Sequence, residues 1–168
     1  FRSCVAIAFL LGANGAAAAD APRGVTVSCT SPVHPVLIRN EHGPLTRVTL
    51  DVGDSKDVRL RSIAFDLGGT DSLDDLESLS LYANGEKEEF AAAVQFGQAA
   101  KPTATVSFRG EQALRAGKNH FWLSCRLKPT AELSHGVVAN CKSVEMSSGT
   151  VAPGGKAVRV RHRIGVAL

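Results

Sequence analysis

The sequence predicts an all-β protein, an antiparallel β-sandwich of jelly-roll-like character with one short helical turn. Apolar and polar residues alternate with a period of two along many short segments, as is typical of half-buried strands. Gly, Pro and Asn turns separate these segments at a spacing that suits about nine or ten strands. With 168 residues, the chain is long enough for one domain with a core and hardly for two.

Each strand is predicted from the apolar residues that would share one of its faces. The clearest cases, in chain order, are 45–52 (Val48, Leu50, Val52), 89–97 (Phe90, Ala92, Val94, Phe96), 103–108 (Ala104, Val106, Phe108) and 157–168 (Val158, Val160, Ile164, Val166). Segment 57–67 changes parity, from even-numbered Leu60 to odd-numbered Ile63, which predicts a β-bulge near Arg61 and Ser62.

Residues 70–79 are the only helical candidate, with a short turn that Asp71 would cap and with Leu73 and Leu76 facing inward. The same stretch contains four acidic residues, Asp71, Asp74, Asp75 and Glu77. They lack the alternating Asp/Asn and Gly spacing of a calcium loop, so a solvated turn is favoured over a cation site. No His or Cys spacing indicates zinc, and no cofactor or metal is predicted.

The stretch from Gly117 to Leu127, "GKNHFWLSCRL", contains the only Trp of the chain. Its odd positions, Phe121, Leu123, Cys125 and Leu127, make a core face, so Trp122 points the other way. Either a loop or a neighbouring domain covers Trp122, or its exposed ring stacks on a sugar. If the domain binds sugar, Trp122 and Tyr82 are the first candidates for contact.

Cys29, Cys125 and Cys141 follow the N-terminal segment. If the strands of Cys125 and Cys141 were hairpin partners, the two side chains could form a disulfide. The alternative is two buried free thiols, because Cys packs well as a small apolar residue. Near the C-terminal end, Arg159, Arg161 and Arg163 form a basic stripe. The stripe suits an anionic sugar carboxylate, the solvent side of an edge strand, or contact with a following domain.

The N-terminal residues read as an export signal. Arg2 precedes an apolar run, and Ala17, Ala18 and Ala19 fit a cleavage site before Asp20. We therefore expect a signal peptide over 1–19, truncated at its start, and a single domain over 20–168. The apolar run is too short to span a membrane, and the protein is expected in the periplasm or outside the cell. A net charge of +3 argues against nucleic acid as the main partner.

From about Val25 to Leu168, the chain resembles the N-terminal β-sandwich domain of secreted bacterial sialidases (neuraminidases) of the BNR/Asp-box family. The residues that carry the resemblance are "SPVHPVLIRNEHGPLTRVTLDV", "DDLESLSLYANG", "LRAGKNHFWLSCRL", "VVANCKSVEM" and "HRIGVAL". The resemblance implies a non-catalytic accessory module that helps to bind carbohydrate or to position a catalytic propeller. That propeller, expected beyond the sequence given, would remove terminal sialic acids from glycoconjugates, so sialylated glycans are expected partners.

The resemblance also implies a Tyr nucleophile paired with Glu, an Asp acid/base and three Arg residues in the catalytic domain. Here Tyr82 lies in an ordinary strand, Gly165 replaces the Pro expected after Arg163 and Ile164, and no Asp-box occurs. No catalytic residue is therefore assigned. Two alternatives stay open: an accessory sandwich of another exported carbohydrate-active enzyme or esterase, and a self-contained adhesion module.

Overall fold

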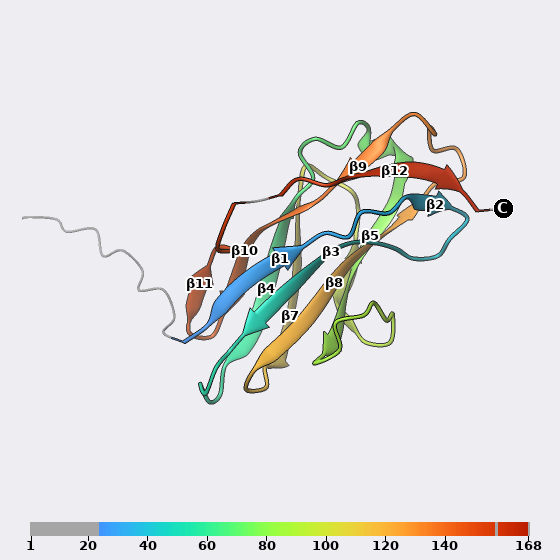
Figure 1. The fold of residues 1–168 in the computed structure, drawn as a ribbon. Coiled ribbons are helices and arrows are strands. Elements are labelled where there is room, and N and C mark those ends of the chain that lie inside the picture. Colours follow the sequence, from blue (N-terminus) through green and yellow to red (C-terminus); the bar gives the residue numbers. More distant parts are fainter. Residues whose placement is uncertain (1–23, 157, 168) are drawn as a thin grey trace, which may run out of the picture.

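The computed structural model describes residues 24–156 and 158–167. The predicted signal peptide, 1–19, lies outside them. The described part is mostly β-strand, as predicted, with a sandwich of two antiparallel sheets and a smaller third sheet at one edge (Figure 1). Within these residues no helix is both long enough and apolar enough to cross a membrane.

The larger sheet has five strands in the order β1-β3-β8-β5-β6, and every pair is antiparallel. The strands are β1 (Thr26–Thr30), β3 (Gly43–Asp51), β8 (Lys118–Leu127), β5 (Leu76–Gly85) and β6 (Gln95–Ala100). The central strand β8 places Phe121, Leu123, Cys125 and Leu127 in the core, each at most 3% exposed. This confirms the predicted core face and leaves the even-numbered residues of β8 on the outer face of the sheet.

The second sheet has four strands in the order β11-β10-β4-β7. The strands are β11 (Gly149–Val151), β10 (Asn140–Met146), β4 (Arg59–Asp66) and β7 (Thr105–Ala113). The register of β4 against β7 shifts between Leu60 and Ser62, so the bulge predicted there is confirmed. The shift turns Leu60 and Ile63 toward the same core, although one is even-numbered and the other odd-numbered.

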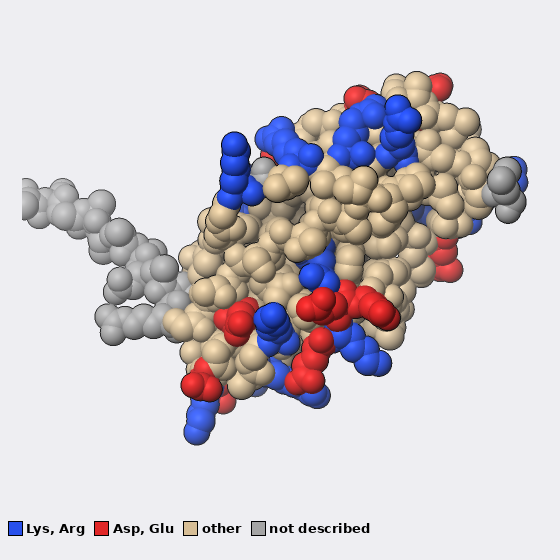
Figure 2. Space-filling view, in the orientation of Figure 1, with Lys and Arg blue, Asp and Glu red and all other residues tan. Residues whose placement is uncertain are grey.

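The third sheet joins three short strands that lie far apart in the sequence. They are β2 (Val36–Ile38), β12 (Arg161–Val166) and β9 (Gly136–Val138), with β12 in the middle, parallel to β2 and antiparallel to β9. On β12, His162 and Ile164 are buried and the arginines at 161 and 163 are exposed, as the predicted alternation requires. Figure 2 shows Lys and Arg side chains gathered along the edge where β9 and β12 lie.

Two predicted strands are shorter than expected. Residues 86–94 form a loop between β5 and β6, which we call the β5–β6 loop, and Val94 is 56% exposed. Gly97 has a φ of +70°, and a Cβ there would lie 2.6 Å from the carbonyl oxygen of Arg109, so the chain turns closely past β7 after this loop. At the other end, β12 begins only at Arg161 and leaves Val158 75% exposed.

The predicted helical turn is present as a 3₁₀ turn over Leu73–Asp75. Its cap is Ser72, whose hydroxyl accepts a hydrogen bond from the backbone N–H of Asp74, and not Asp71 as predicted. Asp71 instead accepts from the backbone N–H of Gly136 and pairs with Arg161. The carboxylate therefore ties the turn to the third sheet rather than closing the turn itself.

Candidate functional site

The outer face of the five-stranded sheet displays the polar and aromatic residues of β5 and β8 in register. Tyr82 lies opposite Trp122, and Ser80 lies opposite Ser124. One pair further along, Ser78 lies opposite Arg126. Because alternate residues of a strand point to opposite faces, these six side chains share one surface. It has two halves, one closed and one open.

The closed half is centred on Trp122, which is 8% exposed. Its indole N–H donates a hydrogen bond of 2.9 Å to the backbone carbonyl of Glu88 in the β5–β6 loop. The ring of Phe90, from the same loop, meets the indole edge to face at 6.1 Å between ring centroids. The guanidinium carbon of Arg47 lies 5.9 Å from the centre of the indole ring. Trp122 is thus held by apolar, hydrogen-bonding and cation–π contacts within this domain.

Of the two alternatives for Trp122, the structure shows the covered ring, and the covering loop belongs to this chain. The other alternative, an exposed Trp122 ring that stacks on a sugar, does not hold in this structure, because Phe90 and Glu88 cover the indole. Sequence reasoning missed this role of Phe90, which it placed on the core face of a strand. The available signal was a lone aromatic residue directly after the charged run from Glu86 to Glu89.

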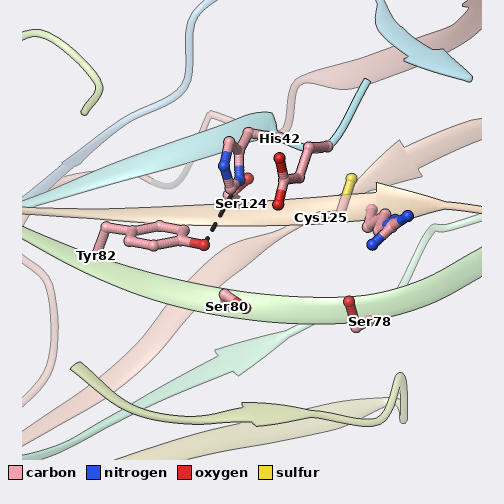
Figure 3. Close-up of a pocket in the computed structure, with 8 residues that line it drawn as sticks. His42, Ser78, Ser80, Tyr82, Ser124 and Cys125 are labelled. Atoms are coloured by element: carbon pink, nitrogen blue, oxygen red, sulfur yellow. Dashed lines mark hydrogen bonds between the residues drawn. The ribbon is translucent and has the colours of Figure 1, made fainter. Parts of the chain in front are cut away.

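The open half is a polar hollow of about 130 Å³ beside Tyr82, which we call the serine pocket. Figure 3 shows Ser78 and Ser80 on one strand, Ser124 on the next, and the Tyr82 hydroxyl directed toward His42. That hydroxyl lies 3.5 Å from His42 Nδ1, a long hydrogen bond. The pocket is lined by Glu41, His42, Ser78, Ser80, Tyr82, Ser124, Cys125 and Arg126.

Ser124 is the least satisfied of these groups. Its residue is 2% exposed, and its hydroxyl oxygen has no hydrogen-bond partner within the described chain. A buried hydroxyl without a partner costs free energy, so it favours any ligand or water that can pair with it. At the rim, Arg126 Nε already contacts Glu77 Oε2 at 3.0 Å. The pocket therefore offers hydroxyl groups more readily than an unpaired cation, a chemistry that suits the hydroxyls of a neutral polyol.

Residues 24–156 and 158–167 supply one hydrogen-bond partner to the Tyr82 phenol. The hydrogen-bond partner of its phenol is His42, and no carboxylate is bonded to it there. Arg163 lies on β12, in a different sheet.

Two of the acidic residues near the 3₁₀ turn, Asp71 and Asp75, are held by structural contacts. Asp75 accepts from the backbone N–H of Glu132 at 3.0 Å and contacts His135 Nδ1 at 2.7 Å. The hydrogen bond from Arg161 holds the pKa of Asp71 below its ordinary value, and the N–H of Gly136 acts in the same direction. Among the residues described, no cluster of three or more potential metal ligands forms.

The strands of Cys125 and Cys141 are not hairpin partners, so the condition for a disulfide between these residues is not met. Cys125 lies on β8, whose neighbours are β3 and β5, whereas Cys141 lies on β10 in the other sheet. Burial raises the pKa of the Cys125 thiol to about 12, so this thiol stays protonated near neutral pH. Cys29, Cys125 and Cys141 are all free thiols in the structure. The side chain of Cys141 is close to that of Cys29, not to that of Cys125.

Comparison with known proteins agrees with this architecture. Residues 25–150 match the family model of the N-terminal domain of BNR-repeat neuraminidase. A sialidase of Bacteroides fragilis (strain YCH46) is 24% identical over 165 residues, covering 80% of this chain and 29% of that protein. The solved structure of the Hadza microbial sialidase Hz136 superposes with a TM-score of 0.65 at 18% identity, over 83% of this chain and 31% of that one.

The chain thus spans less than a third of the length of either relative. The family match extends over most of the described sandwich. The chain therefore belongs to the family of N-terminal domains of BNR-repeat neuraminidases.

Proposed function

We propose that this domain is the N-terminal module of an exported exo-sialidase and that it positions a catalytic propeller and assists glycan binding. The match of residues 25–150 to the neuraminidase N-terminal domain carries the proposal. It is supported by the site, where the Tyr82 phenol is hydrogen-bonded to His42 and to no carboxylate of the described residues, which suits binding rather than glycoside cleavage. Catalysis would then lie in the part of the protein outside this chain.

The surface proposed to contact the propeller is the edge formed by β2 and β12. Val33 there is 89% exposed, and it borders a largely apolar hollow of about 290 Å³ together with His34, Pro35, Arg161 and Arg163. Val166, at the end of β12, is 44% exposed. Exposed apolar residues flanked by arginines are typical of interfaces between domains. The basic stripe predicted from the sequence would then serve as a contact surface.

The proposed glycan contact is the serine pocket. Tyr82 supplies a phenol, three serines supply hydroxyls, and the buried Ser124 hydroxyl lacks a partner. A hollow of about 130 Å³ is smaller than the roughly 300–1,000 Å³ of a drug-sized ligand site, so it would hold part of one sugar residue. Weak binding, strengthened by attachment to the catalytic domain, is the expected regime.

Export of the protein is the third part of the proposal. It is supported by the residues of segment 1–19, which have the charge, apolar run and small residues of a secretory signal. Sialylated glycoconjugates would then be met in the periplasm or outside the cell.

The test compares three proteins: the full-length protein, the same protein without residues 24–168, and a fragment of residues 24–168. Each is assayed on a small soluble sialoside and on a multivalent sialylated glycoprotein. The expected result is no hydrolysis by the fragment, and a larger loss on the glycoprotein than on the small sialoside when the domain is removed. Hydrolysis by the fragment, or a full-length protein that cleaves no sialoside, would overturn the proposal.

The docking surface is tested in the full-length protein with Val33→Asp and Arg163→Glu. Both should loosen the domain from the propeller and increase proteolytic cleavage between them. The matched control is Val94→Asp, at an exposed site on the β5–β6 loop. Equal cleavage of all three variants would exclude this edge as the contact surface.

A further inference from the structure

Cys29 and Cys141 come from different sheets and meet at the edge where β1 lies against β10 (Figure 1). Cys29 pairs across the ladder with Val48 of β3, and it shares a face with the buried Val27. Cys141 pairs across the other ladder with Phe65 of β4 and packs against the core. Both cysteines line one hollow of about 260 Å³ at this edge. The fold thus brings together two thiols that are far apart in the sequence.

The two side chains are also close enough to affect each other's ionisation. A hydrogen bond from Cys141 lowers the pKa of Cys29, and the same bond, together with burial, raises the pKa of Cys141. The Cys29 sulfur is therefore the one that becomes a thiolate more easily. Cys29 is also an exposed residue, so a reagent in solution can reach it.

We propose that Cys29 and Cys141 form a disulfide that joins the edge strand β1 of the five-stranded sheet to β10 of the four-stranded sheet. For its setting in the cell, this inference rests on the export proposed above, because disulfides persist in exported proteins. The bond would close the sandwich at an edge otherwise held by the 2.9 Å hydrogen bond from the N–H of Gly154 to the carbonyl of Val27.

The chemistry is thiol–disulfide exchange with a disulfide oxidant, either a small molecule such as oxidised glutathione or an oxidised dithiol protein. The Cys29 thiolate attacks one sulfur of the oxidant and releases the other as a thiol. The Cys141 thiol then loses its proton and attacks the sulfur of Cys29, which releases the second thiol. Two thiols of the protein are oxidised, one disulfide of the oxidant is reduced to two thiols, and the protons pass to the released sulfurs.

Cys125 provides an internal control. It is 2% exposed, it lies on the core face of β8, and burial raises its pKa to about 12. A thiol of this kind neither reaches an oxidant nor ionises near neutral pH. The structure therefore assigns one specific pair rather than general oxidation of the cysteines.

The decisive experiment is a peptide map of the full chain after incubation with oxidised and reduced glutathione. The protein is alkylated under denaturing conditions and digested with trypsin, which places each cysteine in a separate peptide: 3–23, 24–39, 119–126 and 127–142. The expected product links 24–39 to 127–142 and leaves 119–126 alkylated. Full alkylation of 24–39 and 127–142, or a link from either to another peptide, would overturn the proposal.

Thermal unfolding gives a second, independent measurement. The oxidised chain should melt about 5–15 °C above the chain treated with dithiothreitol, because the bond closes a loop of more than a hundred residues. Cys29→Ser should abolish this difference, and Cys125→Ala should keep it. An oxidised chain that melts at the same temperature as the reduced one would contradict the proposal. Both measurements are made in vitro on the purified chain. A negative result would therefore overturn the disulfide while leaving export and the sialidase assignment intact. Failure of the export or sialidase proposal would likewise leave the disulfide result unaffected.

Discussion

The two halves of the outer face of the five-stranded sheet share the strands β5 and β8 but differ in what covers them. In the closed half, Trp122 is covered by the β5–β6 loop through Glu88 and Phe90. In the open half, two residues further along β8, Ser124 lines a pocket, and its buried hydroxyl has no partner in the described chain. The comparison shows that strand alternation decides which face a side chain occupies, whereas a loop decides whether that side chain stabilises the fold or remains available to a ligand.

The largest expected difference in stability between the two halves comes from truncating Trp122, the residue at the centre of the closed half. Trp122→Ala should lower the free energy of unfolding by about 3 kcal/mol, because it deletes a large covered side chain and its hydrogen bond to the loop. Urea unfolding followed by circular dichroism measures the change. The matched control, Val94→Ala at an exposed site of the loop, should change it by less than about 0.5 kcal/mol. A similar small loss for both variants would mean that the closed half does not stabilise the fold.

A smaller change opens the closed half without removing Trp122. Phe90→Ala should cost about 1–2 kcal/mol, because Phe90 is only partly buried, and it should uncover one side of the indole. Trp122 is the only tryptophan of the chain, so its fluorescence should shift to longer wavelength. An unchanged emission maximum would show that Phe90 does not shield the ring.

A buried histidine beside the closed half predicts a dependence on pH. His120 is 2% exposed and bonded to Thr49 at 2.9 Å, and burial, followed by the charge of Arg47, lowers its pKa. The folded state therefore keeps His120 neutral, while the unfolded chain takes up a proton below about pH 6.5. Stability should be lost as pH falls from that value through the lowered pKa, by at most about 1.4 kcal/mol per pH unit for this residue.

His120→Gln should remove this contribution and flatten the pH profile of the free energy of unfolding between pH 7 and pH 5. Burial also lowers the pKa of His162, on β12, so some dependence should remain in the variant. If the free energy of unfolding of His120→Gln varied with pH as that of the wild type does, the whole pH dependence would come from groups other than His120.

The smallest effect on stability is expected in the open half. Ser124→Ala removes a buried hydroxyl without a partner, so the free energy of unfolding should rise or stay within about 1 kcal/mol. If the serine pocket binds glycan, the same variant and Tyr82→Phe should weaken binding of a sialylated oligosaccharide in an NMR titration. A loss of stability like that of Trp122→Ala would show that the two halves do not differ as described.

Much of the fold could be predicted because it follows local rules. Alternation along β8 identified Phe121 and Leu123 as core, and the parity change in β4 located the bulge near Arg61. The resemblance to sialidase N-terminal domains predicted the sandwich as a whole, and the match of residues 25–150 to the neuraminidase domain agrees with that prediction. Each of these inferences needed only neighbouring residues or the order of segments along the chain.

The remaining features depend on contacts between distant residues. Phe90 alternates with Ala92 and Val94 as a core strand would, but it leaves that face to pack on Trp122. Cys141 follows β8 closely enough in sequence to suggest a hairpin, but β10 pairs with β4 in the other sheet. Strand order and loop coverage are set by tertiary packing, which alternation alone does not encode.

The parallel pairing of β2 with β12 has a consequence for the order of events during synthesis. Val36 pairs with Ile164, so β2 is made long before its partner. At about 5–20 residues per second, the wait is on the order of 10 s. The strands of the two main sheets are complete by Val151, before β12 exists. We therefore expect the nascent sandwich to fold first and to carry an unpaired β2 edge for seconds, until the arrival of β12 closes it.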